Sequence, residues 1–423
     1  MIPRRARDDK AAPSTDTTNT MRLAPISHEI LAVDGGTPVR KTLLPYGRQS
    51  IGEDDLEAVV AVLRSDWMTT GPKVGEFEEA FAARVGAKHA VSFSSGTAAL
   101  HGAAFAAGLK PGDEAVTSPL TFAATANCVL YLGATPVFAD VSADTLNLDP
   151  EQVAARITPR VRVLLPVDYA GHPADMDAIQ EIAARHGLLV IEDACHALGA
   201  EYRQRRAGSI ADMTVFSFHP VKHIATGEGG MVTTDRADFA DALRRFRNHG
   251  ISSDARQRQS EGQWHYEMVL LGFNYRLTDI ACSLGLSQLK KLGANLLRRR
   301  EIADRYAAAF RELNAVTAPV VRSDVSPAWH LYPIRLNLER LSADRAQVFR
   351  ALRAENIGVN VHYIPVHRHP YYRDRFGYRD GEYPVAEDAY ERLLSLPIFH
   401  GMSDQDVEDV ICAVQKVMGH FAR

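Results

Sequence analysis

The chain has 423 residues, of which 46% are hydrophobic and 24% charged, and its formal net charge is −4. This length suits two or three domains, and the ordinary composition predicts a globular core. Because there is no long basic run and no stretch of about 20 apolar residues, we expect neither a nucleic-acid partner nor a membrane span. Four cysteines without a Cys-x-x-Cys spacing predict reduced, mostly buried thiols in a cytoplasmic protein; they are Cys128, Cys195, Cys282 and Cys412.

The first 30 or so residues are polar and aperiodic, as in Ser14–Thr20. They contain no apolar segment of the kind found in secretory signals. We therefore expect residues 1–35 to form a disordered extension. The alternative is a start codon assigned too far upstream, with synthesis beginning at Met21.

Between about residues 50 and 250, short apolar runs alternate with helical patterns. Runs rich in β-branched residues predict strands, and a period of about 3.6 residues predicts helices. The expected strands are Ala90–Phe93, Glu114–Thr117, Thr135–Phe138, Val161–Val167, Leu188–Ile191, a run ending at Ser217, and Gly230–Thr234. The expected helices are Gly96–Gly108, Phe122–Leu132 and Asp175–His186. Such strand–helix units predict an α/β fold with a mostly parallel sheet, which binds ligands at the carboxyl ends of its strands.

The pattern of apolar and polar residues changes after Asp279. A long helical pattern runs from Asp279 to about Leu313, and the segments that follow predict strands at Trp329–Leu336 and Ile357–Tyr363 around a helix at Ala346–Glu355. These elements indicate a smaller α+β domain. We place the large domain at residues 36–285 and the small C-terminal domain at residues 286–423.

A lysine and an aspartate lie at the ends of two expected strands. Lys222 follows the strand that ends at Ser217, and Asp193 ends the run Leu188–Asp193. Pyridoxal 5′-phosphate (PLP) needs a lysine to hold its aldehyde as a Schiff base and a carboxylate to keep its pyridine nitrogen protonated. Asp193 could instead be an ordinary carboxylate at a strand end. However, Glu192 and Asp193 together are costly to bury without a cationic partner.

The segment Ser94–Thr97 lies between a strand and a helix. Helix N-termini carry unpaired N–H groups and about half a positive charge, so this turn suits a phosphate. The alternative is a simple N-cap, for which Ser and Thr are favoured anyway. Beside Lys222 and Asp193, we favour the phosphate interpretation.

Other residues near these strand ends have both a functional and a structural interpretation. Phe122 could stack on a flat cofactor or belong to the core. Ser217 could donate to the phosphate or simply end its strand, and His219 and His223 could contact substrate, although packing is the safer assignment. The glycines of residues 227–230 predict a turn with positive φ; they are Gly227, Gly229 and Gly230.

Taken together, these residues resemble the PLP-dependent sugar aminotransferases of the DegT/DnrJ/EryC1/StrS group, which have fold type I. The likeness runs from about Leu43 to Val417. The segments that carry it are Thr69–Pro72, Ser95–Leu100, Asp113–Phe122, Gly133–Pro136, Asp168–Gly171, Glu192–Gly199, Phe216–Lys222, Gly227–Gly230 and Gly272–Asp279. The resemblance implies a large domain with a mostly parallel, seven-stranded sheet and a smaller C-terminal α+β domain.

The resemblance also implies a role for each matching residue. Lys222 would form the Schiff base with the cofactor, and Asp193 would meet the pyridine nitrogen. The phosphate would be bound by Gly96, Thr97 and Ser217; Phe122 would stack on the ring, and His196 would lie near the ring hydroxyl. Asn274 would reach the phosphate of the neighbouring subunit's cofactor, which implies a homodimer with shared active sites. We expect no metal at the site.

Within the family, two branches are most similar: enzymes that aminate C4 of UDP-4-keto-6-deoxy-N-acetylhexosamines, and enzymes that aminate a UDP-4-keto-pentose. Pro45–Gln49, Ser287–Lys291 and Val361–Tyr363 favour the first. The expected amino donor is L-glutamate. The candidate substrate contacts are Tyr46, Arg48, His219, His362 and Tyr363. Cys195, where the family more often has a small residue, is expected to be tolerated packing.

Three other functions compete with this one. A PLP-dependent sugar dehydratase of the same fold would have histidine in place of Lys222. A non-catalytic binding protein of this fold would have lost the lysine, the aspartate or the phosphate turn. A nucleotide-binding module built on Gly227–Gly230 would need that turn to open a helix, whereas it precedes an expected strand.

Overall fold

The computed structural model describes residues 30–252, 258 and 262–423. The expectation for residues 1–29 lies outside this range. The last part of the expected extension, residues 30–35, belongs to the fold instead: Ala32–Asp34 form a short helix, η1, and Leu31 is fully buried in the C-terminal core. The reason is Leu31, whose apolar side chain enters that core, whereas its neighbour Ile30 remains 64% exposed.

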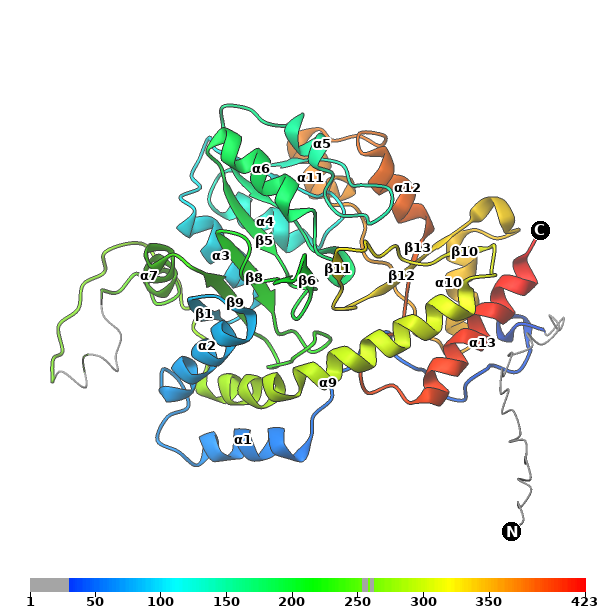
Figure 1. Cartoon of the computed structure of the whole chain (residues 1–423), viewed down its shortest axis with the longest axis horizontal. Coiled ribbons are helices and arrows are strands. Elements are labelled where there is room, and N and C mark those ends of the chain that lie inside the picture. The colour runs from blue at the N-terminus through cyan, green and yellow to red at the C-terminus, as the bar shows by residue number, and fades with distance from the viewer. Residues whose placement is uncertain (1–29, 253–257, 259–261) are drawn as a thin grey trace, which may run out of the picture.

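A seven-stranded sheet forms the centre of the large domain (Figure 1). Its strand order is β1-β9-β8-β5-β4-β2-β3, and β9 alone runs antiparallel to its neighbours. This confirms the expected α/β fold with a mostly parallel sheet. The strands are β1 His89–Phe93, β2 Glu114–Thr117, β3 Thr135–Phe138, β4 Val161–Leu165, β5 Leu189–Asp193, β8 Met213–Ser217 and β9 Gly230–Thr234.

Helices cover both faces of this sheet. Successive residues of a strand point to opposite faces, so Val163 and Ile191 enter one core layer, while Leu164 and Val190 enter the other. Helices α3 Gly96–Ala106, α4 Ala123–Tyr131 and α7 Ala237–Phe246 pack against the first layer, and α6 Met176–His186 packs against the second. A third layer contains α2 Pro72–Val85 and part of α9 Asp279–Phe310.

Helix α9 connects the two parts of the molecule. Its N-cap, Thr278, accepts a hydrogen bond from the N–H of Ala281. The carboxylate of Asp279 accepts from the N–H groups of Gly71 (2.7 Å) and Lys73 (2.9 Å), which fixes the start of α2. The expected boundary between residues 285 and 286 falls inside this helix, which packs on α1 Glu53–Leu63 and α2 near its start and on α13 Asp404–Phe421 further along.

The C-terminal part has a three-stranded antiparallel sheet with the order β10-β12-β13, made of Val316–Thr317, Tyr332–Leu336 and Leu393–Leu396. The helices α10 Arg345–Ala354 and α13 share its core. The remaining elements are α5 Pro150–Ala154, α11 Pro370–Phe376, α12 Pro384–Arg392, the short helices η2 Tyr169–Gly171, η3 Leu338–Arg340 and η4 Val366–Arg368, and the strands β6 Glu201–Tyr202, β7 Arg205–Arg206 and β11 Val325–Ser326.

Two expected strands of this part need correction. Ile357–Tyr363 is not a strand: β13 takes the ladder position beside β12, and residues 357–363 form only isolated bridges at Ile357 and Asn360. The alternating apolar residues that suggested a strand are buried without a ladder; Ile357 is 0% and Val359 3% exposed. Strand β12 begins at Tyr332 rather than Trp329, because Trp329 has a φ of 52° that no strand can contain.

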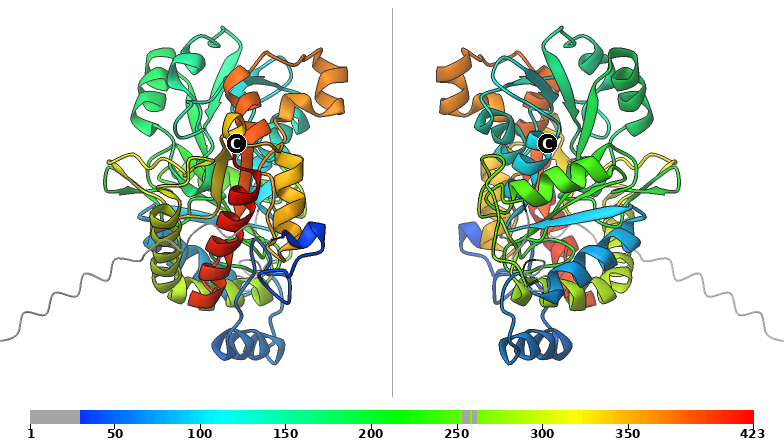
Figure 2. Two further views of the ribbon diagram at one scale, coloured as in Figure 1. Left: turned by 90° about the vertical axis from the view of Figure 1, so that its right-hand side faces the viewer. Right: turned by 90° about the vertical axis from the view of Figure 1, so that its left-hand side faces the viewer.

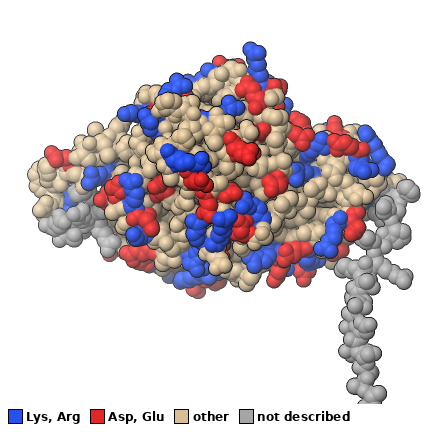
Figure 3. All heavy atoms as spheres, turned by 45° about the horizontal axis from the view of Figure 1, so that its top comes forward, with Lys and Arg blue, Asp and Glu red and all other residues tan. Residues whose placement is uncertain are grey.

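Four further features concern the surface, the periphery and the thiols. On the face drawn in Figure 3, acidic and basic side chains are interspersed. Helix α1 lies at the edge of the molecule, beyond α9 (Figures 1 and 2). Within the described residues, no helix is both long and apolar enough to cross a membrane. All four cysteines are free thiols; two are buried, Cys195 is half-buried and Cys412 is exposed.

Candidate active site

A cavity of about 500 Å³ opens at the carboxyl ends of the parallel strands. Residues that follow β1, β2, β4, β5 and β8 line it, and segments from the N-terminal and C-terminal parts close it. Its lining includes Tyr46, Ser95, Gly96, Thr97, Thr121, Phe122, Thr125, Val167, Asp193, Cys195, His196, Ser217, His219, Lys222, Glu228, His330, Asn360, His362 and Tyr363. The cavity therefore lies where ligands bind on sheets of this kind.

Lys222 lies in this cavity, five positions after the end of β8. Its Nζ is 3.5 Å from Nε2 of His330. Burial lowers the pKa of the Lys222 amine, and the charge of Arg299 lowers it further, while Cys195 and Asp193 act in the opposite direction. A lysine with a lowered pKa is more often neutral, as a nucleophile must be.

Asp193 is the last residue of β5 and is 5% exposed. Its Oδ2 accepts a hydrogen bond from the hydroxyl of Thr125 (2.7 Å), and its Oδ1 accepts from the N–H of Cys195 (3.1 Å). The hydroxyls of Thr125 and Thr121 are also 2.8 Å apart. These donors orient the carboxylate at the cavity. Sequence reasoning missed Thr125, whose only signal was a hydroxyl one turn after Phe122 in an apolar helix.

The turn before α3 is built by close packing. Ser95 is the N-cap and accepts a hydrogen bond from the N–H of Ala98 (3.1 Å), so the structural interpretation of this residue holds. A Cβ on Gly96 would lie 2.9 Å from Cβ of Ser217, and a Cβ on Gly230 would lie 2.5 Å from the carbonyl oxygen of Ser95. The glycines therefore let β8 and β9 approach the helix N-terminus, whose first N–H groups have no intrahelical partner.

The glycines of residues 227–230 differ from the expectation. Only Gly227 has a positive φ, of 84°. Gly229 and Gly230 do not have a positive φ. A side chain is excluded there by close neighbours, because a Cβ on Gly229 would lie 2.4 Å from Oγ1 of Thr226 and Gly230 packs against Ser95. The turn needs one left-handed residue and two close approaches.

Several neutral histidines surround Lys222. His196 lies 2.9 Å from the hydroxyl of Tyr363 through Nε2, and its buried Nδ1 has no hydrogen-bond partner among the described residues. Burial lowers the pKa of His196 and His330 well below the usual range, with the charge of Lys222 acting in the same direction. His362 forms a hydrogen bond with the hydroxyl of Ser395 (2.9 Å), and burial lowers its pKa to about 4.

The structure brings most of the expected site residues together. Tyr46, His219, His362 and Tyr363 line the cavity, and the side chain of Phe122 is 60% exposed within its lining. Two residues are not brought to it: Arg48 is exposed and outside the lining, and Asn274 is exposed outside the cavity of its own chain. His223 is buried behind the cavity, where its Nε2 lies 2.9 Å from the carbonyl oxygen of Ala328.

Two buried carboxyl groups lie behind Asp193. Among the described residues, Oδ2 of Asp168 and Oε1 of Glu192 have no hydrogen-bond partner outside this pair, whereas Oε2 of Glu192 accepts from Thr214 (2.8 Å). Burial raises the pKa of Asp168 well above its usual range, and the negative charge of Glu192 adds to the effect. Burial also raises the pKa of Glu192. We infer that Asp168 is protonated and donates a hydrogen bond to Glu192.

We expect the free energy of unfolding of Asp168→Asn to increase, relative to that of the unmodified protein, as the pH rises. A carboxyl whose folded pKa is raised stabilises the fold fully below its unfolded pKa, and this contribution is lost as the pH rises through the folded value. The amide can donate to Glu192 without titrating, and each unit of raised pKa is worth about 1.4 kcal/mol. Urea unfolding between about pH 4 and about pH 8 measures the difference.

Asp149→Asn is the matched control for this experiment, because Asp149 caps α5 and asparagine caps helices equally well. A stability difference for Asp168→Asn that stays constant across the pH range would contradict a protonated Asp168.

Comparisons with known proteins agree with this site. A family model described as the DegT/DnrJ/EryC1/StrS aminotransferase family matches residues 49–415. The chain is 48% identical over 381 residues to SpsC, a spore coat polysaccharide biosynthesis protein of Bacillus subtilis, covering 90% of this chain and 98% of that protein.

Solved structures are similar as well. PseC of Helicobacter pylori, an aminotransferase involved in the biosynthesis of pseudaminic acid, is 31% identical with a TM-score of 0.84 and covers 90% of this chain and 100% of its own. A putative sugar aminotransferase of Streptococcus pneumoniae, solved in its PLP form, is 30% identical with a TM-score of 0.83, over 89% of this chain and 98% of its own.

The fold and the cavity define an enzyme of the fold type I class that uses PLP as its cofactor. Within that class, the chain belongs to the DegT/DnrJ/EryC1/StrS aminotransferase family and is a sugar aminotransferase.

The residues of this chain fit PLP. The space beside Gly96 that a Cβ would fill lies at a helix N-terminus, next to the hydroxyl of Ser217, and suits a phosphate. The carboxylate of Asp193 and the amine of Lys222 share one cavity. His196, in the same cavity, has a buried Nδ1 that no described residue contacts by a hydrogen bond.

Gly230→Ala should weaken the affinity for PLP by about tenfold or more. The new Cβ would lie 2.5 Å from the carbonyl oxygen of Ser95, so the turn before α3 must shift, and small displacements at ligand sites are costly. Fluorescence titration of the apoenzyme with PLP measures the change. Gly75→Ala, in α2 with open space around its Cβ, is the control and should be neutral. Equal affinities for the two variants would show that the close approach at Gly230 is irrelevant to the cofactor.

Proposed function

We propose that this enzyme transfers an amino group from L-glutamate to the keto carbon of a nucleotide-linked sugar, at C4 of a UDP-4-keto-6-deoxy-N-acetylhexosamine. The observation that carries the transfer reaction is the presence of Lys222 and Asp193 in one cavity at the carboxyl ends of the sheet. The similarity to PseC supports the choice of sugar, as do the segments Pro45–Gln49 and Val361–Tyr363, which contribute Tyr46, His362 and Tyr363 to the lining.

Each residue has a defined task in this reaction. PLP, when bound, supplies an electron sink that makes the α-carbon of the donor acidic. Lys222 is the attachment point for the cofactor, and its Nζ, once released, removes the proton from the α-carbon. Asp193 holds the proton on the pyridine nitrogen by charge pairing, and Thr125 keeps the carboxylate oriented.

The other cofactor contacts are assigned by position. Gly96, Thr97 and Ser217, at the N-terminus of α3, would hold the phosphate, Phe122 would cover one face of the ring, and His196 would serve the ring hydroxyl; all five residues line the cavity. In the substrate part of the cavity, Tyr46, His219, His362 and Tyr363 are the proposed contacts.

We propose further that the enzyme works as a homodimer. Lys222 is the single Lys or Arg side chain in the described lining of the cavity, although a nucleotide sugar and glutamate both carry negative charges. The exposed segment before Asn274 is apolar, with Trp264 84%, Met268 68% and Leu271 75% exposed. A second copy that covered this surface would remove it from water and could bring Asn274 to the neighbouring phosphate.

The apolar face of α1 supports the same assembly, because Leu56 and Leu63 are each about half exposed, at 51% and 52%. Sedimentation of the holoenzyme measures its mass directly. A monomer at assay concentrations would contradict the shared active site.

A visible absorption spectrum before and after addition of L-glutamate tests the proposed reaction. A yellow band that bleaches on addition of the donor supports the first half of the transfer. Candidate UDP-4-keto sugars are then added to the bleached enzyme, and the one that restores the band is the acceptor. A yellow band that no amino donor changes would favour a dehydratase or a non-catalytic protein of this fold.

A further inference from the structure

A guanidinium group is buried in the interior without an acidic partner. Arg299, on α9, is 1% exposed, and no carboxylate among the described residues forms an ion pair with it. Its Nη1 donates to the backbone carbonyls of Ile398 (2.9 Å), Trp329 (3.0 Å) and His330 (3.3 Å), and burial lowers the pKa of the guanidinium to about 10. Because an unpaired buried cation is costly, it indicates a function for these contacts.

The segment that Arg299 contacts has an unusual backbone. Trp329 has a φ of 52°, a left-handed conformation that a bulky residue rarely adopts. Opposite Arg299, the carbonyl oxygen of Ala170 accepts from the N–H groups of His330 (3.0 Å) and Leu331 (3.2 Å). A strained conformation persists only where its surroundings fix it from several sides, and here Arg299 and the Ala170 loop provide those contacts.

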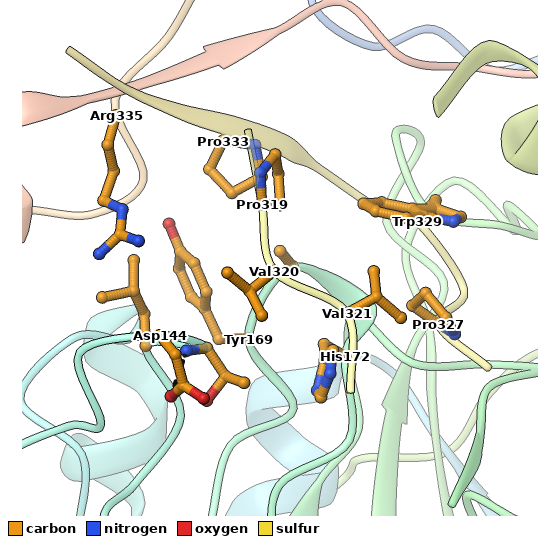
Figure 4. Close-up of a pocket in the computed structure, with 13 residues that line it drawn as sticks. Asp144, Tyr169, His172, Pro319, Val320, Val321, Pro327, Trp329, Pro333 and Arg335 are labelled. Carbon is orange, nitrogen blue, oxygen red and sulfur yellow. Dashed lines mark hydrogen bonds between the residues drawn. The ribbon is translucent and has the colours of Figure 1, made fainter. Parts of the chain in front are cut away.

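This backbone sends two neighbouring side chains into different cavities. Trp329 lines a small cavity of about 30 Å³ together with Tyr169 and Val321 (Figure 4), whereas His330 lines the active-site cavity. Trp329 is not part of an ordinary alternating strand, because its φ is 52° and β12 begins only at Tyr332. The position of His330 therefore depends on the conformation that Arg299 holds.

His330 contacts the amine of Lys222. Its Nε2 is 3.5 Å from Nζ, and within the described part of the chain its buried Nδ1 has no hydrogen-bond partner. Burial and the charges of Lys222 and Arg299 lower the pKa of the His330 imidazole well below its usual range, so the ring is neutral. With its proton on Nδ1, the ring can accept a hydrogen bond from the lysine amine at Nε2.

We propose that Arg299 and His330 form a positioning unit for Lys222, in which Arg299 fixes the backbone of residues 329 and 330 and His330 receives the amine whenever it is not joined to the cofactor. The proposal rests on the proposed function in one respect, namely that Lys222 is the lysine that joins PLP. The buried charge of Arg299 has a second effect, since it disfavours protonation of the Lys222 amine.

Other groups also face Lys222 and contribute to its state. Asp193 and Cys195 favour the protonated amine, whereas Arg299 opposes it. The imidazoles around Lys222 are neutral at ordinary pH because burial lowers the pKa of each; they are His196, His223, His330 and His362. Arg299 is therefore the positive charge among these groups whose removal should raise the pKa of the Lys222 amine.

The test follows the reaction of the full-length apoenzyme with PLP by absorbance, as a function of pH. Only the neutral amine of Lys222 adds to the aldehyde, with loss of water. The pH profile of the rate therefore measures the pKa of the amine, and the plateau rate at high pH measures how well the amine is positioned. Arg299→Met should shift the profile to higher pH and lower the plateau. Arg299→Lys, which keeps the charge but loses the planar fork, should lower the plateau by about tenfold without the shift.

His330→Phe fills the same space without an acceptor, and it should lower the plateau rate and kcat by about tenfold while leaving the KM for the sugar unchanged. His330→Gln, which keeps a polar group near the position of Nε2, should restore part of the loss. The matched control is His400→Phe, since His400 is also half-buried near Arg299 but does not contact Lys222. If Arg299→Met does not fold, Arg299→Lys and His330→Phe still decide the question.

The outcomes separate the two proposals. If unmodified apoenzyme forms no absorption band with PLP, the assignment of Lys222 itself fails. If it does, but His330→Phe behaves like His400→Phe or the Arg299→Lys plateau matches the unmodified protein, the positioning unit alone is refuted.

Discussion

Lys222→Ala should lower turnover by about ten-thousand-fold or more, the largest effect of any single substitution in the chain. The same amine would attach the cofactor and carry the proton, so its loss removes a nucleophile and a base together. No other lysine or arginine lines the described part of the cavity to replace it. Steady-state assays with glutamate and a keto sugar measure the loss, and borohydride reduction followed by mass spectrometry shows whether PLP is still joined to the chain.

Two controls make this result specific. Lys88→Ala removes an exposed lysine next to β1 and should leave turnover unchanged. Lys222→Arg keeps the positive charge but should remain inactive, because a guanidinium is not a nucleophile at ordinary pH. Turnover by Lys222→Ala within tenfold of the unmodified enzyme would refute the proposed mechanism.

Asp193→Asn should reduce turnover by about a hundredfold to a thousandfold, the scale of losing one preorganised electrostatic contact in an active site. The amide has nearly the same shape, and its one oxygen can still accept from the N–H of Cys195 while its NH2 group donates to the hydroxyl of Thr125, but it carries no charge to hold a proton on the pyridine nitrogen. The exchange of the α-proton of glutamate with deuterated solvent measures this step separately from the sugar reaction.

The Asp149→Asn protein again provides the comparison, since it undergoes the same chemical change outside the cavity. Asp193→Asn should still bind PLP, because Lys222 and the turn at Gly96 are intact. Normal proton exchange in Asp193→Asn would show that the carboxylate has no part in making the α-carbon acidic.

The central sheet could be predicted from the sequence because its strands are short and sharply bounded. Strands β2 and β3 match the expected bounds, since each is a β-branched run between turn residues. The segment Ile357–Tyr363 shows where this reasoning fails. Its alternating apolar residues indicate only that one side is buried, and an irregular segment can bury one side as well as a strand can. The strand that takes the position beside β12, Leu393–Leu396, lies far away in the sequence and could not be foreseen from this segment.

The sequence likewise predicted some residues of the candidate site and missed others. Lys222 and Asp193 were conspicuous because a charged residue at the end of an apolar run is rare in itself. Thr125 and His330 were not, because each matters only through a contact with a residue far away in the sequence: Asp193 for the first and Lys222 for the second. Arg48 is the opposite case: it belongs to a segment that resembles the family, yet its side chain is exposed and lies outside the lining of the cavity.

The burial of Leu31 in the same core as α13 has a consequence for how the protein is made. Leu341 and Ala422 also form a bridge, so both ends of the described chain complete one layer. During synthesis, the strands of the central sheet leave the ribosome long before α13 does, and the early segment around Leu31 must wait for the last helix. Such long-range closure slows folding and keeps apolar surface exposed meanwhile. Emergence of α13, rather than of the central sheet, therefore sets the moment at which this core can be completed.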